Sequence, residues 1–288
     1  MNRRQFTLSC LATAAASSSV LLPSVASANA PVASLPVASV HSRFAEVPRS
    51  TNKPHIAFLV YDGMTLLDLV GPMEILSNNN FDVDFVAASL APVYAESNSN
   101  KRLGVLPTAT FADVSHTDIL FAPGSTNPLQ AVKQPELLAW VAQVGAKATW
   151  VTSVCSGAII LGAAGLLKGY QATSHWGWLD KLRYFGAVPT QQRVVHDGNR
   201  VTGAGVTSGI DFGLVLLSLL LGEDVARARQ LGLEYDPKPP FTGGSVDTAP
   251  VALVERSRDA YQAFLDKVEP QRMQLLQQFA QRLNVQLP

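Results

Sequence analysis

The sequence predicts an α/β fold, a single domain built on a doubly wound, mostly parallel β-sheet with helices on both faces. Residues 55–61 form a run of strand length that is apolar on both faces, which is typical of a strand covered on both sides, and residues 118–122 and 150–154 are predicted as further buried strands. Segments with helical patterns alternate with these strands, and such alternation favours a parallel sheet. With 288 residues, 47% of them hydrophobic, the chain can bury one sizeable core.

Each element is predicted from its local pattern. In chain order they are strands at 55–61 and 82–88, extended segments at 93–111, a strand at 118–122, a helix at 134–145, a strand at 150–154, a helix from 156, a helix at 176–185, a β-hairpin at 193–202 and helices at 206–222 and 223–235. The proline-rich stretch 237–244 predicts a loop. Residues 250–283 then form one long amphipathic helix or two.

A proline constrains the element after the first strand. Pro72 fits the first turn of a helix better than its middle, because a helix through Pro72 would leave the carbonyl of Asp68 without its hydrogen bond. In either case Asp68 lies just past the carboxyl end of the first strand. Open α/β sheets place their ligand sites at that edge.

Cys155 lies between the strand 150–154 and a helix that begins with small residues, Ser156 and Gly157. This is the outline of the nucleophile elbow of G-x-S-x-G hydrolases. The first turn of a helix lowers the pKa of a thiol, and its free N–H groups can stabilise an anion formed during attack. We expect Cys155 to be a nucleophile; the alternative is a small buried hydrophobe, as many free cysteines are.

Three predicted strand ends bring candidate groups to one edge of the sheet. Asp68, Gly124 and Cys155 each follow such an end. We expect Asp68 to donate or accept the proton that nucleophilic addition requires. Backbone N–H groups of Gly124, Ser125 and Ser156 are candidates for stabilising negative charge. The alternatives are a helix cap or a solvated carboxylate for Asp68, and an ordinary turn at Gly124.

Histidines give no sign of a metal site. His175 either orients the Cys155 site or is a hydrogen-bonded structural imidazole. The other four have no ligand spacing with cysteines or carboxylates, so we expect no metal. No G-x-G-x-x-G motif follows a predicted strand.

Composition limits the partners. Lys and Arg number 22 and balance 22 Asp and Glu, so no basic bias points to nucleic acid. No basic amphipathic stretch points to a membrane surface. We therefore expect a small-molecule substrate and no nucleic-acid partner.

The N-terminus predicts export. Residues 2–8, N-R-R-Q-F-T-L, are typical of a twin-arginine signal, and an A-x-A cleavage site follows at 28–30. A short membrane anchor is the alternative, but the apolar run at 11–22 is too short and Ser-rich to span a bilayer well. Cleavage removes Cys10, leaving Cys155 as a free thiol.

These observations divide the chain into a signal peptide (1–30), a flexible leader (31–54), an α/β domain (55–245) and a C-terminal helical extension (246–288). We expect a periplasmic or secreted protein without stable membrane association after signal cleavage.

Several stretches resemble a known family, the ThiJ/PfpI group of the class I glutamine amidotransferase-like superfamily, and within it the isonitrile hydratases. The resemblance spans roughly residues 55–245. Its motifs are L-D-L-V-G-P at 67–72, S-V-C-S-G-A at 153–158, A-T-S-H-W at 172–176, I-D-F at 210–212, L-E-Y-D-P at 233–237 and P-P-F at 239–241.

The resemblance implies a flavodoxin-like fold, a homodimer without cofactors, and hydration of an isonitrile to an N-substituted formamide. Cys155 would attack the terminal isonitrile carbon, and Asp68 would act as acid and base and help to activate water. Ser156 replaces the usual Thr and keeps the hydroxyl. We expect His175 and Trp176 at the substrate site, with Trp178 and Phe241 as further pocket walls.

Two departures from the family accompany this resemblance. The family often has P-G-G where this chain has P-G-S at 123–125, and Ser125 would be strained if that backbone needs a positive φ. The export signal differs from the cytoplasmic location expected of the hydratases. Two other functions stay open: a glutathione-independent glyoxalase-like enzyme acting on small aldehydes, and a ligand or redox sensor in which Cys155 is oxidised.

Overall fold

The computed structural model describes residues 53–97 and 99–287. The predicted signal peptide, and the leader up to residue 52, lie outside the described residues. The described part contains a seven-stranded sheet in the order β10-β11-β7-β6-β1-β2-β5. All neighbours in it are parallel except the β10–β11 hairpin. The predicted doubly wound, mostly parallel sheet is confirmed.

The strands of this sheet are β1 (His55–Leu59), β2 (Asp82–Ala87), β5 (Ala109–Thr110), β6 (Ile119–Ala122), β7 (Trp150–Val154), β10 (Val194–Asp197) and β11 (Arg200–Gly203). Two small sheets pair β3 (Val93–Tyr94) with β4 (Gly104–Val105), and β8 (Gln171–Ala172) with β9 (Val188–Pro189). The helices are α2 (Leu66–Leu76), α3 (Leu129–Val132), α4 (Pro135–Gly145), α5 (Gly157–Ala163), the 3-10 helix η1 (Leu179–Phe185), α6 (Ser208–Leu221), α7 (Glu223–Gly232), α8 (Val251–Val268) and α9 (Arg272–Arg282).

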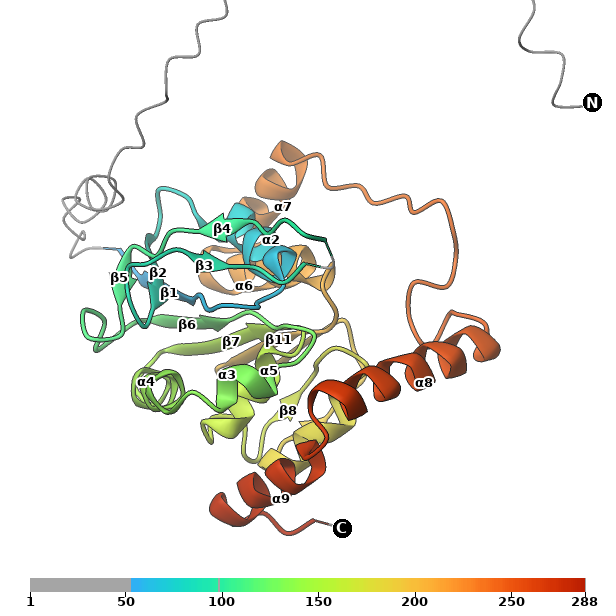
Figure 1. Cartoon of the computed structure of the whole chain (residues 1–288). Helices are drawn as coiled ribbons and strands as arrows, with labels where there is room; N and C mark the ends of the chain where they lie inside the picture. The colour runs from blue at the N-terminus through green and yellow to red at the C-terminus, as the bar shows by residue number, and fades with distance from the viewer. Residues whose placement is uncertain (1–52, 98, 288) are drawn as a thin grey trace, which may run out of the picture. The chain divides into compact units, whose positions relative to one another are not determined.

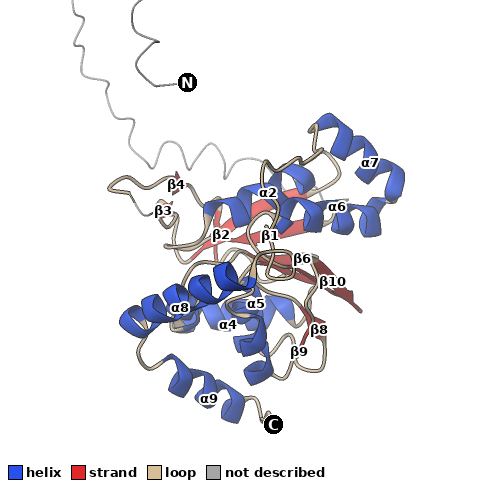
Figure 2. Ribbon diagram, turned by 90° about the vertical axis from the view of Figure 1, so that its right-hand side faces the viewer, coloured by secondary structure: helices blue, strands red, loops and turns tan. Residues whose placement is uncertain are grey.

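Helices cover both faces of the large sheet. Figure 1 shows α2 and α6 on one face, and α3, α4 and α5 on the other. The turned view in Figure 2 shows the same layers, with α8 on the side of α4 and α5. Since both faces are covered, the strands in the middle of the sheet carry apolar side chains on each side.

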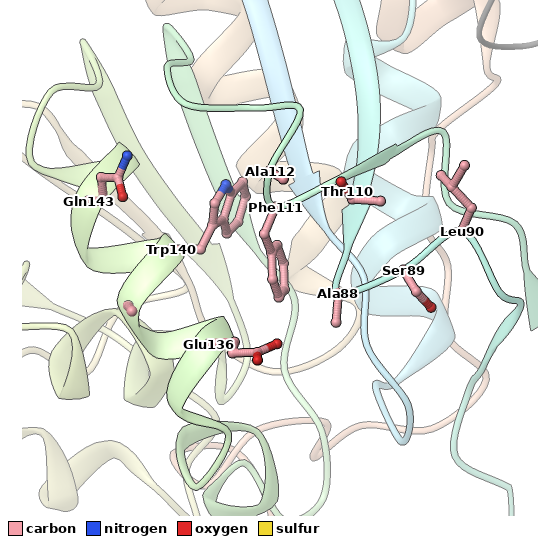
Figure 3. A pocket seen from close by; sticks show the side chains of 10 residues that line it. Ala88, Ser89, Leu90, Thr110, Phe111, Ala112, Glu136, Trp140 and Gln143 are labelled. Carbon is pink, nitrogen blue, oxygen red and sulfur yellow. The ribbon is translucent and has the colours of Figure 1, made fainter.

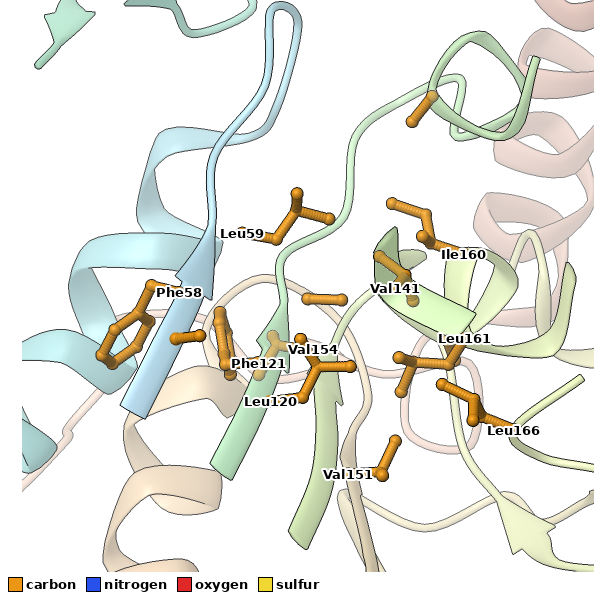
Figure 4. Packing of buried hydrophobic residues seen from close by; sticks show 14 of the residues in the cluster. Phe58, Leu59, Leu120, Phe121, Val141, Val151, Val154, Ile160, Leu161 and Leu166 are labelled. Atoms are coloured by element: carbon orange, nitrogen blue, oxygen red, sulfur yellow. The ribbon is translucent and has the colours of Figure 1, made fainter. Parts of the chain in front are cut away.

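The core confirms this reasoning. Every residue of β1 and β6 is buried. The ring of Phe121 lies 5.1 Å from that of Phe58 and 5.6 Å from that of Phe212 on α6. Figure 4 shows Leu120 and Val151 in the same cluster as Leu161 of α5. Each such side chain contributes about 1.5–3 kcal/mol by leaving water.

The helix α2 runs through Pro72, so the expectation that Pro72 would lie in a first turn is wrong. Packing against α6 favours this arrangement. A Cβ on Gly209 would lie 2.9 Å from the Pro72 ring, and a Cβ on Gly71 would lie 3.5 Å from Ile210. The missing side chains let the two helices approach closely, and this contact offsets the lost helical hydrogen bond.

Two other elements differ from the sequence prediction. The short helix α3 is not predicted by any periodicity. The segment expected as a helix at 176–185 is a 3-10 helix that begins only at Leu179. The C-terminal stretch, predicted as one long helix or two, is two helices, and the break falls at Glu269 and Pro270, where a proline cannot continue α8. No helix in the described residues is both long and apolar enough to cross a bilayer.

Gly157, the first residue of α5, gives a test of this packing. A Cβ there would lie 2.1 Å from the carbonyl oxygen of Ala122, a backbone atom of β6 that cannot move aside. We expect Gly157→Ala to lower the free energy of unfolding by about 1–3 kcal/mol or more. Gly232→Ala, with open space around it, is the control and should stabilise by up to about 1 kcal/mol. Urea unfolding measures both, and equal effects would contradict the packing described.

Candidate active site

Cys155 occupies a strained turn between β7 and α5. Its φ is 58°, in the left-handed region that non-glycine residues rarely adopt. Its N–H donates to the carbonyl oxygens of Gly203 at 3.0 Å and Ala204 at 2.7 Å, which fixes this backbone. Such a conformation costs about 1–3 kcal/mol and is concentrated at functional sites. The predicted elbow is therefore present, and the thiol lies at the carboxyl edge of the sheet.

Asp68 lies in the first turn of α2, with no exposed surface. The N–H of Gly124 donates to its Oδ2 at 3.0 Å, whereas Oδ1 has no hydrogen-bond partner within the described residues. Burial raises the pKa of this carboxyl to about 7; contact with the Cys155 thiol and the Gly124 N–H lowers it, and the charge of Glu96 raises it. Asp68 can thus gain or lose a proton near neutral pH.

Burial also raises the pKa of the Cys155 thiol well above its usual value, and the neighbouring Asp68 charge adds to this effect. The backbone N–H of Ser156 lowers the pKa but does not outweigh burial. The expectation that the helix start would give a low thiol pKa is therefore wrong for the resting site. Instead, thiol and carboxyl form a buried pair in which proton transfer between them is coupled.

The loop after β6 is bonded to the elbow. Ser125 N–H donates to Ser156 Oγ at 2.9 Å, and the Ser156 hydroxyl donates to the Ser125 carbonyl at 2.6 Å. Because the N–H groups of Gly124 and Ser125 already donate within the protein, they do not form the anion site expected of them. The Ser156 N–H remains beside the sulfur.

Residue 124 has to be glycine, since a Cβ would lie 2.5 Å from the Ser156 nitrogen and 2.9 Å from Asp68 Oδ2. Ser125, in contrast, does not have a positive φ. The strain considered for a serine in place of a second glycine is therefore absent.

His175 and Trp176 lie beside the elbow on an aromatic wall. Ser174 Oγ donates to the Cys155 carbonyl at 2.9 Å, which ties their segment to the elbow. The His175 ring lies 4.9 Å from that of Trp176, and burial lowers its pKa, which favours the neutral imidazole. No hydrogen bond joins this imidazole to Cys155 or Asp68 in the described part of the chain, so His175 does not orient either group directly.

The other predicted pocket walls are not confirmed. Trp178 is almost completely buried in the core and presents no open surface. Phe241 is 83% exposed, on the loop between α7 and α8. Its side chain does not line the site in this chain, because the loop carries it into solvent.

Glu96 is a further residue of the site, and no sequence pattern indicates it. This carboxylate accepts hydrogen bonds from the hydroxyl of Thr65, which precedes α2, and from the N–H of Thr126 at 2.9 Å. Its charge raises the pKa of both Asp68 and Cys155. No motif surrounds Glu96, so only the folded arrangement reveals it.

Two motif residues outside the site have structural roles. Asp211 accepts hydrogen bonds from Arg193 Nε at 2.8 Å and from the Tyr235 hydroxyl at 2.9 Å. These bonds join α6, the β10 side of the sheet and the segment after α7. The I-D-F and E-Y-D-P stretches thus stabilise the framework around the site.

Comparison with known proteins shows the class. Residues 54–219 match the model of the DJ-1/PfpI family, and the chain belongs to that family.

Relatives of different function share this similarity. The chain is 43% identical over 204 residues to isonitrile hydratase of Pseudomonas putida, covering 70% of this chain and 88% of that protein. It is 29% identical to the HTH-type transcriptional regulator CdhR of Pseudomonas aeruginosa, covering 59% of this chain and 51% of the regulator. A ThiJ/PfpI family protein from Pseudomonas syringae has 46% identity and a TM-score of 0.69, covering 80% of this chain and 90% of that structure.

The raised pKa of Asp68 predicts a pH-dependent stability. The unfolded carboxyl ionises near 3.8 and the folded one near 7, so the folded state binds the proton more tightly. Stability is therefore lost as pH rises between these values, by at most about 1.4 kcal/mol per pH unit, and stays lower above them. Asp68→Asn cannot ionise and should gain stability over the wild type through this window. Urea unfolding from about pH 4 to about pH 8 measures the difference; a pH-independent difference would show that Asp68 is not perturbed.

Proposed function

We propose that this protein is a cofactor-independent cysteine enzyme that hydrates an isonitrile to an N-substituted formamide. One observation carries the proposal: a thiol on a left-handed elbow contacts a fully buried carboxyl whose pKa is about 7. The similarity to the Pseudomonas putida isonitrile hydratase supports the substrate class. The reaction needs a nucleophile and a group that moves protons, and Cys155 and Asp68 supply them.

In the first step the Cys155 sulfur bonds to the terminal carbon of R–N≡C. Asp68 accepts the thiol proton and delivers it to the same carbon, so that a thioimidate, R–N=CH–S–Cys, forms without net change of charge. Because the proton passes from sulfur through Asp68 to carbon, the net charge of the buried site stays the same and no additional charge is buried. The Ser156 N–H stabilises negative charge on the sulfur.

In the second step Asp68 removes a proton from water as the oxygen adds to the thioimidate carbon, and the nitrogen is protonated. The C–S bond then breaks, the sulfur regains a proton, and R–NH–CHO leaves. Asp68 thus acts as base and then as acid when the thioimidate forms, and it acts as base again when water adds. A pKa near 7 allows both protonation states at neutral pH.

Similarity to a transcriptional regulator supports one alternative to the enzymatic function, namely a ligand or redox sensor of the same fold. In that case Cys155 would be oxidised, and its buried thiol would be the sensing group. We also propose that the protein is exported by its twin-arginine signal and that it forms a homodimer.

Product analysis tests the proposal. The purified chain is incubated with methyl isonitrile, and separately with methylglyoxal, and N-methylformamide and lactate are assayed. We expect formamide from the wild type and none above background from Cys155→Ala or Asp68→Asn, while Ser156→Thr keeps activity because the hydroxyl remains. Circular dichroism serves as the control for folding.

Other outcomes contradict the proposal in distinct ways. Lactate alone would indicate the glyoxalase-like alternative. Neither product, with rapid peroxide oxidation of Cys155, would indicate a sensor. Formamide production by the Cys155→Ala variant would exclude Cys155 as the nucleophile.

A further inference from the structure

The C-terminal helix α8 lies beyond residues 54–219, which match the family, and brings Tyr261 to the site. The Trp178 indole N–H donates to the Tyr261 oxygen at 2.6 Å, and the Tyr261 hydroxyl donates to the carbonyl of Thr126 at 2.6 Å. Thr126 is two residues past Gly124. The phenol is therefore bonded to the loop that holds Asp68 and the elbow.

The ring of Tyr261 completes the aromatic wall beside Cys155. It lies 5.9 Å from the His175 ring, edge-on, and 5.7 Å from the ring of Trp176. A Cβ at residue 177 would lie 2.3 Å from a ring carbon of Tyr261, so the glycine at 177 permits the approach. The charge of Cys155 contributes, after burial, to a raised pKa of the Tyr261 phenol, which agrees with their proximity.

Contacts along the C-terminal segment keep Tyr261 in this position. Glu269, just past the end of α8, is buried; it forms an ion pair with Lys133 and accepts a hydrogen bond from Asn127 Nδ2 at 3.4 Å. On α9, the Phe279 ring lies 5.7 Å from that of Phe185. Contacts C-terminal to Tyr261 thus hold α8 against the domain, and they keep the Tyr261 ring in a fixed position beside the site.

Trp176, whose ring packs near that of Tyr261, also lines a small hollow. This hollow, of about 170 Å³, is lined by Trp176, by residues of the segment 243–249 and by Leu253, Val254 and Ser257 of α8. Another hollow, of about 500 Å³, lies between the ends of β2 and β5 and helix α4, with Phe111 and Trp140 on its wall (Figure 3). It shares no residue with the Cys155 site.

Cys155 is only 4% exposed, so the width of the approach limits what reaches it. We propose that Tyr261 is a specificity-determining residue that admits narrow, unbranched groups to Cys155 and rejects wide ones. For the isonitrile substrate this rests on the proposed function, and there the limit applies to the substituent on nitrogen. The steric limit itself applies to any reagent of the thiol.

Kinetics with two isonitriles test the limit on substrates. We expect Tyr261→Ala to raise the ratio of kcat/KM for cyclohexyl isonitrile over methyl isonitrile by about tenfold, a change typical of altered pocket size. Tyr261→Phe keeps the ring and should leave the ratio unchanged. Phe264→Ala is the matched control, because Phe264 stacks on the outer side of Tyr261 at 6.4 Å and is itself exposed.

Thiol labelling separates this inference from the proposed function. The full chain carrying Cys10→Ser is treated with methyl or benzyl methanethiosulfonate, and Cys155→Ser provides the blank. The benzyl-to-methyl rate ratio should rise about tenfold in Tyr261→Ala and stay unchanged in Tyr261→Phe and Phe264→Ala. If Tyr261→Ala does not fold, Tyr261→Leu, which keeps an apolar side chain against Trp176, replaces it.

The outcomes are distinct. A raised labelling ratio without formamide from the wild type would sustain the role of Tyr261 and reject the isonitrile substrate. An unchanged ratio in a folded Tyr261→Ala or Tyr261→Leu protein would overturn the role of Tyr261, whatever the enzyme's substrate.

Discussion

The candidate site is organised around a carboxyl buried against a thiol. Asp68 has no exposed surface, and one of its oxygens has no hydrogen-bond partner in the described part of the chain, so a charge there is costly because little compensates for lost water. The fold places it there through the first turn of α2, and the Gly124 N–H gives it one hydrogen bond. With a pKa of about 7, Asp68 can both accept and donate a proton beside Cys155 at neutral pH. The proposed hydration requires this proton transfer in each of its two steps.

Close packing maintains this costly arrangement. Pro72 and Gly71 of α2 press against α6, whose Gly209 leaves room for the proline ring. The Cys155 turn is fixed by two carbonyls at the end of β11. Two serines, 125 and 156, bond the neighbouring loop to the elbow. Strain and burial at the site are thus compensated by contacts that do not take part in the chemistry.

Sequence patterns predicted what depends on one segment at a time. Strands β1, β6 and β7 were predictable because they are short runs of mostly apolar or β-branched residues, and Asp68 and Cys155 because strand ends converge at one edge. The strand ends also predict that the N–H groups of Gly124 and Ser125 stabilise an anion, but side-chain oxygens of Asp68 on α2 and of Ser156, just before α5, accept hydrogen bonds from them. Glu96 and Tyr261 come from segments without motifs, and only tertiary packing brings them to the site. Pro72 is a second example, because the packing of α2 against α6 places it inside a helix although proline alone favours a first turn.

The protonation of Asp68 itself tests the central claim most directly. Infrared difference spectra between the wild type and Asp68→Asn isolate the carboxyl stretch of this one residue. We predict a protonated carboxyl at about pH 5 whose signal disappears with a midpoint near pH 7, because burial raises the pKa to about 7. A carboxylate that is fully ionised at about pH 5 would contradict it, because an ordinary Asp has lost its proton there.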